Sequence, residues 1–305
     1  MTASLATARH QPEALRGELR LNEPMSEHTS WRVGGPAERF YLPADLDDLL
    51  SFLRQLDSDE PLFWLGLGSN LLVRDGGIQG TVICTRNRLK GLRALSEDRI
   101  YAEAGVPCGH IAKFCSERRL DGAEFLAGIP GTLGGALAMN AGAFGGETWP
   151  LVERVTTVDR HGALFQRSSA DYKVGYRSVL GPEGEWFVSA ELRLERNDDG
   201  AGREKIKALL ARRNETQPTH LPSCGSVFRN PAGDYSARLI EASGLKGHRL
   251  GGACVSEKHA NFIINTGAAT AADIESLIFH VRDEVLRQQG RELIPEVRIV
   301  GMAKP

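Results

Sequence analysis

The stretch GLGSNLLV, residues 66–73, directly follows the apolar run PLFWL and distinguishes between two ways of binding a nucleotide. Two glycines and a serine here let backbone N–H groups turn toward an anion without obstruction from side chains. A Rossmann fingerprint would require a third glycine at position 71 and a helix after it. Leu71 stands there instead, and LLVRDGG is typical of extended chain. The stretch therefore fits a diphosphate cradle of another kind, or a plain glycine hairpin between two strands.

A second glycine-rich stretch, GIPGTLGGALAMNAGAFGG, covers residues 128–146. So many positions without a side chain indicate a backbone that lies flat against a large planar group or against another backbone. Thr132 and Asn140 are the polar side chains nearby, and their hydroxyl and amide are suited to bond the edge of a heteroaromatic ring. A flavin is a good candidate, and tight internal packing is the alternative. Two such loops on neighbouring units favour one extended cofactor, with its diphosphate at the first loop and its ring at the second.

The composition restricts the functions open to this chain of 305 residues. Apolar residues make up 41% and charged residues 25%, which is typical of a globular protein with a sizeable core. The formal net charge of −2 gives no general attraction to nucleic acid or to an anionic membrane. Five scattered cysteines without a C-x-x-C pair argue against a disulfide framework and a zinc site, and we expect no metal. Because no segment resembles a signal peptide or a membrane span, we expect a cytoplasmic protein.

The order of apolar patterns and loops predicts four parts. We expect a flexible N-terminal tail over residues 1–20, two α+β units over residues 21–94 and 95–202, and a third unit over residues 203–305. Helices are predicted from Asp45, from Pro107, over residues 203–213, and from the Thr270 cap to Gly290. Strands are predicted at residues 61–65, 81–85, 99–105, 153–159 and 187–195.

Seven collinear motifs carry a resemblance to a known family. They are HTSWRVGGPA (28–37), GLGSNLLV (66–73), GIPGTLGGALAMNAGAFGGE (128–147), GYRS (175–178), SCGSVFRNP (223–231), LIEASGLKGHRLGGACVSEKHANFIIN (239–265) and IPEVRIVG (294–301). In this order the sequence resembles the UDP-N-acetylenolpyruvoylglucosamine reductases over nearly its whole length. The resemblance implies an α+β fold, with a two-part FAD-binding domain of the vanillyl-alcohol-oxidase type (residues 21–94 and 95–202) followed by an α/β substrate-binding domain (residues 203–305).

The resemblance also implies an activity. NADPH reduces non-covalently bound FAD, and the reduced flavin reduces UDP-N-acetylglucosamine enolpyruvate to UDP-N-acetylmuramate for peptidoglycan. We expect a monomer with no nucleic-acid or membrane partner. Two alternatives remain open: another FAD enzyme on the same scaffold, such as an oxidase of a small alcohol or sugar, and a nucleotide-sugar binding protein without redox activity.

Site residues follow from the same resemblance. The catalytic residues implied are Arg177, Ser226 and Glu296, and the substrate-binding residues are Tyr176 and Asn230. The cofactor-binding residues implied are Gly66, Gly68, Ser69, Asn70, Leu71, Gly128, Pro130, Gly131, Thr132, Gly134, Gly135, Asn140, Gly142 and Ala143. Arg213, Arg229 and Lys258 are further cations that could hold the diphosphate or could equally be solvated.

The chemistry of the implied catalytic residues agrees with these roles. Hydride transfer to the end of an enolpyruvyl double bond leaves negative charge on the neighbouring carbon and its carboxylate. Arg177 is permanently charged and can hold that carboxylate with paired N–H donors. Ser226 is small enough to deliver a proton to carbon, and Glu296 would orient and polarise the enolate. Ser226 has no G-x-S-x-G elbow around it, so we expect no covalent catalysis, and Cys224 is expected to be inert.

Two features depart from the common family pattern. Ser178 directly follows Arg177, where the family commonly has one residue between the arginine and the serine, so no role is assigned to Ser178. Only 48 residues separate Arg177 from Ser226, which indicates the short subclass without the inserted tyrosine loop that closes over the substrate.

Overall fold

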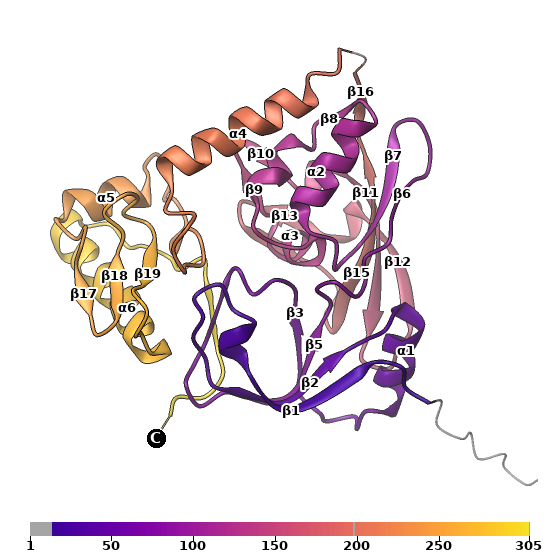
Figure 1. Ribbon diagram of the computed structural model, residues 1–305, viewed down its shortest axis with the longest axis horizontal. Coiled ribbons are helices and arrows are strands. Elements are labelled where there is room, and N and C mark those ends of the chain that lie inside the picture. Colours follow the sequence, from indigo (N-terminus) through magenta and orange to yellow (C-terminus); the bar gives the residue numbers. More distant parts are fainter. Residues whose placement is uncertain (1–13, 198, 305) are drawn as a thin grey trace, which may run out of the picture.

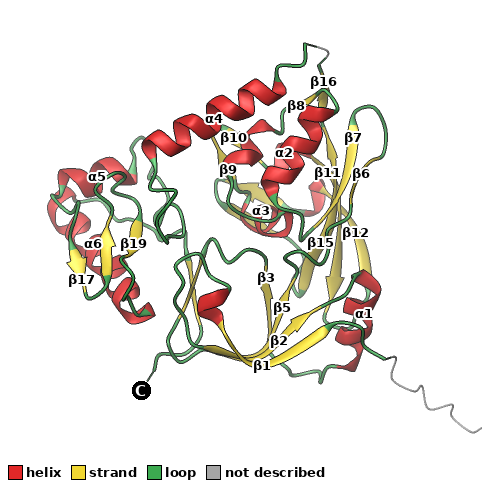
Figure 2. Cartoon of the chain, in the orientation of Figure 1, coloured by secondary structure: helices red, strands yellow, loops and turns green. Residues whose placement is uncertain are grey.

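The computed structural model describes residues 14–197 and 199–304, which form three packed units (Figure 1). Helices and strands are mixed throughout, as Figure 2 shows, and the predicted α+β class is confirmed. Within the described residues, no helix is long and apolar enough to cross a membrane. Short 3-10 helices lie at Met25–Glu27, Glu124–Gly128, Trp149–Leu151 and Ser169–Asp171.

The first unit is a four-stranded sheet in the order β1-β2-β5-β3. Its elements are β1 (Glu18–Pro24), β2 (Pro36–Leu42), α1 (Leu46–Gln55), β3 (Leu62–Leu65), β4 (Leu71–Val73) and β5 (Ile78–Cys84), where β4 lies outside this sheet. Helix α1 begins as predicted, because the Asp45 carboxylate accepts a hydrogen bond from Asp48 N at 3.0 Å. Its buried face packs against Val158 and Val188 of the second unit, so α1 joins the two units.

The predicted tail is too long. Residues 1–13 of it lie outside the described residues, but β1 already begins at Glu18 and pairs antiparallel with β2. The strand has no buried residue, and Leu21 is 67% exposed. Leu19 and Leu21 alternate with polar residues, but two apolar positions are too few to distinguish a short exposed strand from a tail.

The second unit is an antiparallel five-stranded sheet in the order β12-β11-β15-β7-β6. The sheet consists of β6 (Leu92–Ala94), β7 (Arg99–Glu103), β11 (Val152–Asp159), β12 (Leu164–Ser168) and β15 (Glu185–Arg193). The unit also contains three separate strand pairs, which are β8 (Leu120–Asp121) with β16 (Glu195–Arg196), β9 (Gly142–Ala143) with β10 (Gly146–Glu147), and β13 (Lys173–Gly175) with β14 (Ser178–Leu180). The predicted boundary after residue 94 is wrong by one strand, because β6 pairs with β7 and belongs to this sheet.

Helices α2 (Cys108–Glu117) and α3 (Leu133–Met139) pack on this sheet. Helix α2 begins after Pro107, as predicted. Helix α3 lies inside the stretch 128–146, where a glycine-rich loop was expected. The low helix propensity of its two glycines hid it. A Cβ at Gly134 would lie 3.0 Å from the Cβ of Ala104, so the glycine lets the helix approach the end of β7 closely.

The third unit follows α4 (Gly202–Thr216), the long helix that runs across the top of Figure 1. Its elements are α5 (Ser236–Ala242), β17 (Arg249–Leu250), β18 (Ala253–Val255), β19 (Ile263–Asn265), α6 (Ala271–Gln289) and β20 (Arg298–Val300). Helix α6 has the predicted Thr270 cap, ends at the predicted Gly290 and buries one apolar face that includes Ile274, Leu277 and Val281. Strand β20 leaves this unit and pairs in parallel with β4, so the last residues of the chain return to the first unit.

Candidate active site

Three cavities that share lining residues lie in series between the units. The outer cavity, of about 490 Å³, shares Gly66, Thr132 and Gly135 with a narrow cavity of about 150 Å³. The narrow cavity in turn shares Ser69 and Asn70 with a central cavity of about 280 Å³. The series forms one elongated space, which fits an extended cofactor better than a compact ligand.

The three predicted catalytic residues converge on the central cavity. Arg177, Ser226 and Glu296 all line it, although they come from three different parts of the chain. The predicted substrate-binding residues Tyr176 and Asn230 line it too, and Tyr176 is 48% exposed at its mouth. The arrangement brings one cation, one hydroxyl and one carboxyl group to a single small space, as an acid-assisted reduction of an anionic substrate requires.

Arg177 lies in the turn between β13 and β14 and is held by three acceptors. Its Nε donates to Glu296 Oε1 at 3.1 Å, across 119 positions of sequence. Its Nη1 and Nη2 donate to the backbone carbonyls of Asn140 (3.2 Å) and Gly142 (2.7 Å). Arg177 has a φ of 51°, and the tight turn sends its side chain back into the cavity.

Backbone pairing places Ser226 next to Glu296. Glu296 N donates to Val227 O at 2.7 Å, and Phe228 forms an isolated bridge with Pro295. The residue after the serine is therefore bonded to the glutamate itself. These backbone contacts fix the spacing of the two chain segments that carry Ser226 and Glu296.

Burial makes Glu296 a weaker acid than an exposed glutamate. Burial raises the pKa of its carboxyl group, and the charge of Arg177 and its hydrogen bond, followed by the charge of Arg229, oppose the rise without cancelling it. The Glu296 side chain is 13% exposed. A raised pKa favours the protonated acid, which suits a group that polarises a developing enolate.

Cys224 lies behind the serine rather than in competition with it. Its thiol is buried, donates to Leu71 O at 3.4 Å, and has a pKa raised to about 12 by burial. The thiolate that a nucleophile requires is therefore not formed near neutral pH. The buried, hydrogen-bonded thiol supports the expectation of an inert cysteine.

The cofactor loop is connected to the catalytic residues through Asn70. Its Nδ2 donates to Glu296 O at 3.1 Å, and its carbonyl accepts from Arg298 N at 3.1 Å. Strands β4 and β20 continue this pairing, with Arg298 opposite Leu71. No pattern within GLGSNLLV or IPEVRIVG predicts that the two segments contribute adjacent strands.

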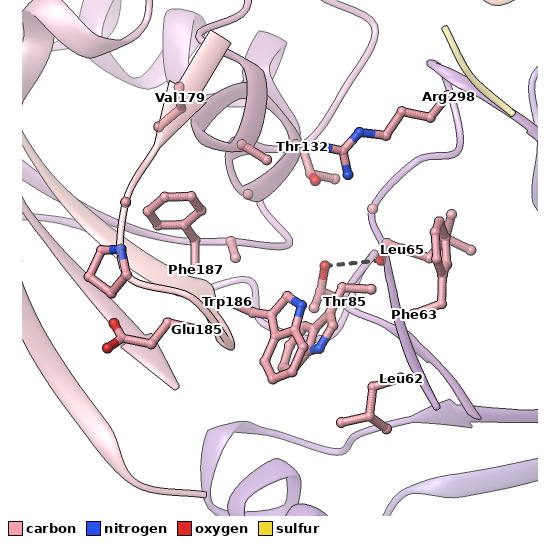
Figure 3. A pocket seen from close by; sticks show the side chains of 18 of the residues that line it. Leu62, Phe63, Leu65, Thr85, Thr132, Val179, Glu185, Trp186, Phe187 and Arg298 are labelled. Atoms are coloured by element: carbon pink, nitrogen blue, oxygen red, sulfur yellow. Dashed lines mark hydrogen bonds between the residues drawn. The ribbon is translucent and has the colours of Figure 1, made fainter. Parts of the chain in front are cut away.

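The walls of the outer cavity carry polar atoms without a partner, as a ligand site would. Thr132 Oγ1, Trp64 Nε1 and Tyr172 OH are buried and have no hydrogen-bond partner among the described residues. Trp64 stacks on Trp186 with ring centroids 5.3 Å apart. In Figure 3 the guanidinium of Arg298 extends toward Thr132. A cation, three unsatisfied polar groups and stacked aromatic walls fit the diphosphate and nucleoside parts of FAD.

Thirteen of the fourteen predicted cofactor-binding residues line one of the three cavities. Asn140 is the exception and corrects the expectation of an amide at the ring edge. It is 1% exposed, its Nδ2 donates to Glu147 Oε2 (2.9 Å) and Gly175 O (3.2 Å), and its Oδ1 accepts from Trp149 N (3.1 Å). Both amide N–H groups are therefore used inside the protein.

Sequence reasoning missed several groups. Trp64, Tyr172 and Arg298 carried no motif that distinguished them from core or surface residues. Of the three further cations proposed for the diphosphate, Arg213 lines the central cavity, and burial lowers its pKa. Arg229 and Lys258 do not line it, and Lys258 Nζ donates to Asn214 O instead.

Comparisons with known proteins agree with this geometry. A family model described as "FAD binding domain" matches residues 37–167, and one described as "UDP-N-acetylenolpyruvoylglucosamine reductase, C-terminal domain" matches residues 217–300. The chain is 69% identical to a UDP-N-acetylenolpyruvoylglucosamine reductase of Methylococcus capsulatus, with 95% of each chain covered. It is 65% identical to the one of Alkalilimnicola ehrlichii, over 94% of this chain and 96% of that one.

A solved structure agrees as well. The chain superposes on the crystal structure of UDP-N-acetylenolpyruvylglucosamine reductase from Thermus caldophilus with a TM-score of 0.78 and 30% identity. The match covers 94% of this chain and 99% of that chain.

Proposed function

The chain belongs to the UDP-N-acetylenolpyruvoylglucosamine reductase family, and from this premise we propose that Arg177, Ser226 and Glu296 carry its reaction in the central cavity. The protein is a flavoprotein reductase of peptidoglycan synthesis that converts UDP-N-acetylglucosamine enolpyruvate to UDP-N-acetylmuramate with NADPH. Its fold is a two-part FAD-binding domain of the vanillyl-alcohol-oxidase type followed by a substrate-binding domain. The observation that supports the assignment of these residues is the convergence of cation, hydroxyl and carboxyl groups at one cavity.

FAD, when bound, takes a hydride from NADPH and supplies it to the terminal carbon of the enolpyruvyl double bond. The residues proposed to hold it are the thirteen cavity-lining residues described above, together with Arg298, Trp64 and Tyr172 of the outer cavity. Loop 66–71 and the turn at Thr132 both line the narrow cavity and suit the diphosphate, because both present backbone and small polar groups.

Arg177 is proposed to bind the substrate carboxylate and stabilise the negative charge that develops there. Two of its three acceptors are neutral carbonyls, so its positive charge is offset only by Glu296. Because burial raises the pKa of Glu296, that offset is weaker than a surface ion pair would give. A cation preorganised in this way lowers the energy of the enolate without having to move during the reaction.

Ser226 is proposed to donate its hydroxyl proton to the carbon next to the carboxylate. Each turnover then adds one hydride to the terminal carbon and one proton to this carbon, and the serine is reprotonated from water. Glu296 Oε1 is engaged by Arg177, so its second carboxyl oxygen is proposed to polarise the enolate or to hold the proton. The short backbone connection between Val227 and Glu296 keeps these two groups at one site.

Tyr176, Asn230 and Arg213 are proposed to bind the nucleotide part of the substrate, since all three line the central cavity. The 48 residues between Arg177 and Ser226 form β14, β15, β16 and α4, and on this basis we assign the chain to the short subclass. All five cysteines are free and buried, in keeping with a reducing compartment, and we propose a cytoplasmic monomer.

Replacement of the proposed proton donor tests the assignment. Ser226→Ala is expected to keep FAD and to let NADPH bleach the flavin, while turnover of the enolpyruvyl substrate falls at least about 10²-fold. Anaerobic rapid mixing measures the two half-reactions separately. Cys224→Ala is the matched control, because it removes a neighbouring buried side chain with no proposed role in the reaction. Near-normal turnover by Ser226→Ala would contradict the donor role.

A further inference from the structure

Asn140 occupies an unusual position at the end of α3. Its φ of 47° is left-handed, a conformation that asparagine tolerates better than most residues, and it ends the helix. It is 1% exposed, and its side chain is anchored by Trp149 N and by Glu147 Oε2. The residue is therefore a rigid point within the second unit.

The hairpin that carries Arg177 is packed on one strand only, because Val179 of β14 contacts the core of the second unit whereas β13 is exposed. Strands β13 and β14 pair only with each other, and residues 173–176 are exposed. One of the contacts that hold this hairpin to the rest of the unit is a hydrogen bond from Asn140 Nδ2 to Gly175 O at 3.2 Å. The acceptor of this hydrogen bond, Gly175, lies two residues before Arg177.

The main chain of Asn140 also holds the guanidinium group of Arg177. Its backbone carbonyl accepts from Arg177 Nη1 at 3.2 Å, and Gly142 O, two residues on, accepts from Nη2 at 2.7 Å. One buried residue thus bonds the hairpin through its side chain and the guanidinium through its main chain. Asn140 is uncharged in both contacts, so it orients the arginine without offsetting the positive charge of the guanidinium.

We propose that Asn140 is the positioning residue for Arg177, which sets where the guanidinium stands relative to the substrate carboxylate. The inference rests on the proposed function, in which Arg177 binds that carboxylate. The position of the guanidinium matters for the rate, because a misplacement of a reacting group by about 1 Å lowers the rate about 10²-fold.

A double-mutant cycle tests the proposal in the full-length, FAD-loaded protein. Asn140→Gly keeps the left-handed backbone and the carbonyl but removes the side chain that holds Gly175. We expect the rate of flavin reoxidation by the enolpyruvyl substrate to fall about 10- to 10²-fold when Arg177 is present. In an Arg177→Ala background the same change is expected to cost less than about threefold, because the group being positioned is gone.

A control and an independent readout separate positioning from general loosening. Thr148→Ala removes a buried hydrogen bond of 2.7 Å to Ala141 O in the same loop and does not touch the hairpin. Hydrogen exchange of residues 173–180 is expected to rise in Asn140→Gly and not in Thr148→Ala. If Asn140→Gly does not fold, Asn140→Asp replaces it, since it keeps the acceptor for Trp149 N and loses both donors.

The outcomes distinguish the two proposals. Equal losses in both backgrounds, or a loss in Thr148→Ala as large as in Asn140→Gly, would overturn the role of Asn140. Normal turnover by Arg177→Ala alone would instead overturn the role of Arg177 in the reaction. Non-additive losses together with faster exchange of the hairpin would support the positioning role.

Discussion

Gly66 and Thr132 lie in contact with each other on the wall of the space proposed for the cofactor, and a single methyl group tests that arrangement. A Cβ at Gly66 would lie 2.4 Å from Thr132 Oγ1. The threonine is 1% exposed and stands at the N-cap of α3, yet its hydroxyl makes no capping bond. That hydroxyl is instead one of the unpartnered groups of the outer cavity. Gly66→Ala would therefore push directly on a group assigned to the cofactor.

The size of the effect follows from the distances. Ordinary van der Waals contacts begin near 3.4 Å, so the two loops must separate by about 1 Å. Overpacking of this kind typically costs about 1–3 kcal/mol. If the separation is opposed by FAD, which must contact both loops, the affinity for FAD falls about 5- to 150-fold. When Thr132→Ala is combined with Gly66→Ala, the Cβ at position 132 lies 3.5 Å from the new methyl group, which is an ordinary contact. The free energy of FAD binding then loses only the contribution of the threonine hydroxyl, about 1 kcal/mol.

The four proteins of this cycle give a sharp test. Dissociation constants for FAD from flavin fluorescence, and free energies of unfolding from urea titration, are measured for the original protein, both single variants and the double variant. We expect Gly66→Ala to be the weakest binder and the double variant to bind FAD as well as Thr132→Ala does. Thr132→Val keeps a branched side chain in the same place and is not expected to relieve the clash. Additive losses in the double variant would refute the reasoning, because the two positions would then act independently.

Two further outcomes concern stability. Because burial raises the pKa of Glu296 above about 4.5, its contribution to stability is present below that pH and is lost as the pH rises through the raised value. Glu296→Gln is thus expected to have a higher free energy of unfolding than the original protein at pH 8 and to lose that advantage at acidic pH. A difference that does not depend on pH would contradict the raised pKa of Glu296. Asp75 accepts from Ala271 N and Ala272 N, both at 3.0 Å, at the start of α6. Asp75→Ala should cost about 1–2 kcal/mol by thermal unfolding, against little change for the exposed Asp57→Ala.

The elements that the sequence predicted well are those whose signals are local. Helix α6 carries its start at Thr270 and its end at Gly290 within its own residues, and both were found in the structure. The Asp45 cap of α1 is of the same kind. A capped amphipathic helix can be read from one stretch because each signal acts within one or two turns.

The elements that were missed depend on partners far away in sequence. Strand β1 has little apolar side chain to bury and exists because β2 offers it a ladder of hydrogen bonds. Strand β6 is the exception, because its partner β7 follows it across a turn; a strand of only three residues gave too short a pattern to be assigned to the right unit. Helix α3 contains two glycines that weaken its local signal, and tertiary packing near Ala104 overrides that weakness.

The site shows the same division. Arg177, Ser226 and Glu296 were identified through motifs, whereas their individual patterns indicate a turn serine, a surface arginine and a charge at the end of a strand. Ser226 and Glu296 are brought together by the pairing of Val227 with Glu296, and Arg177 joins them through its hydrogen bond to Glu296. Neither contact leaves a periodic trace in the sequence. The geometry of the site is a property of non-local backbone contacts.

The stretch 128–146 left two explanations open, a ligand beside the backbone and tight internal packing, and the glycines divide between them. A Cβ at Gly142 would lie 2.3 Å from Gly146 O and 3.1 Å from Arg177 Nη1, so that glycine is required by the protein itself. At Gly131 and Gly135 the nearest atoms are 3.6 Å and 4.0 Å away, and both residues line the narrow cavity. Packing explains the first glycine and leaves the other two unexplained. A Cβ at either position would make only ordinary contacts, so the protein itself does not require glycine there, and we expect the flavin cofactor to lie on the side of the narrow cavity that these two residues line.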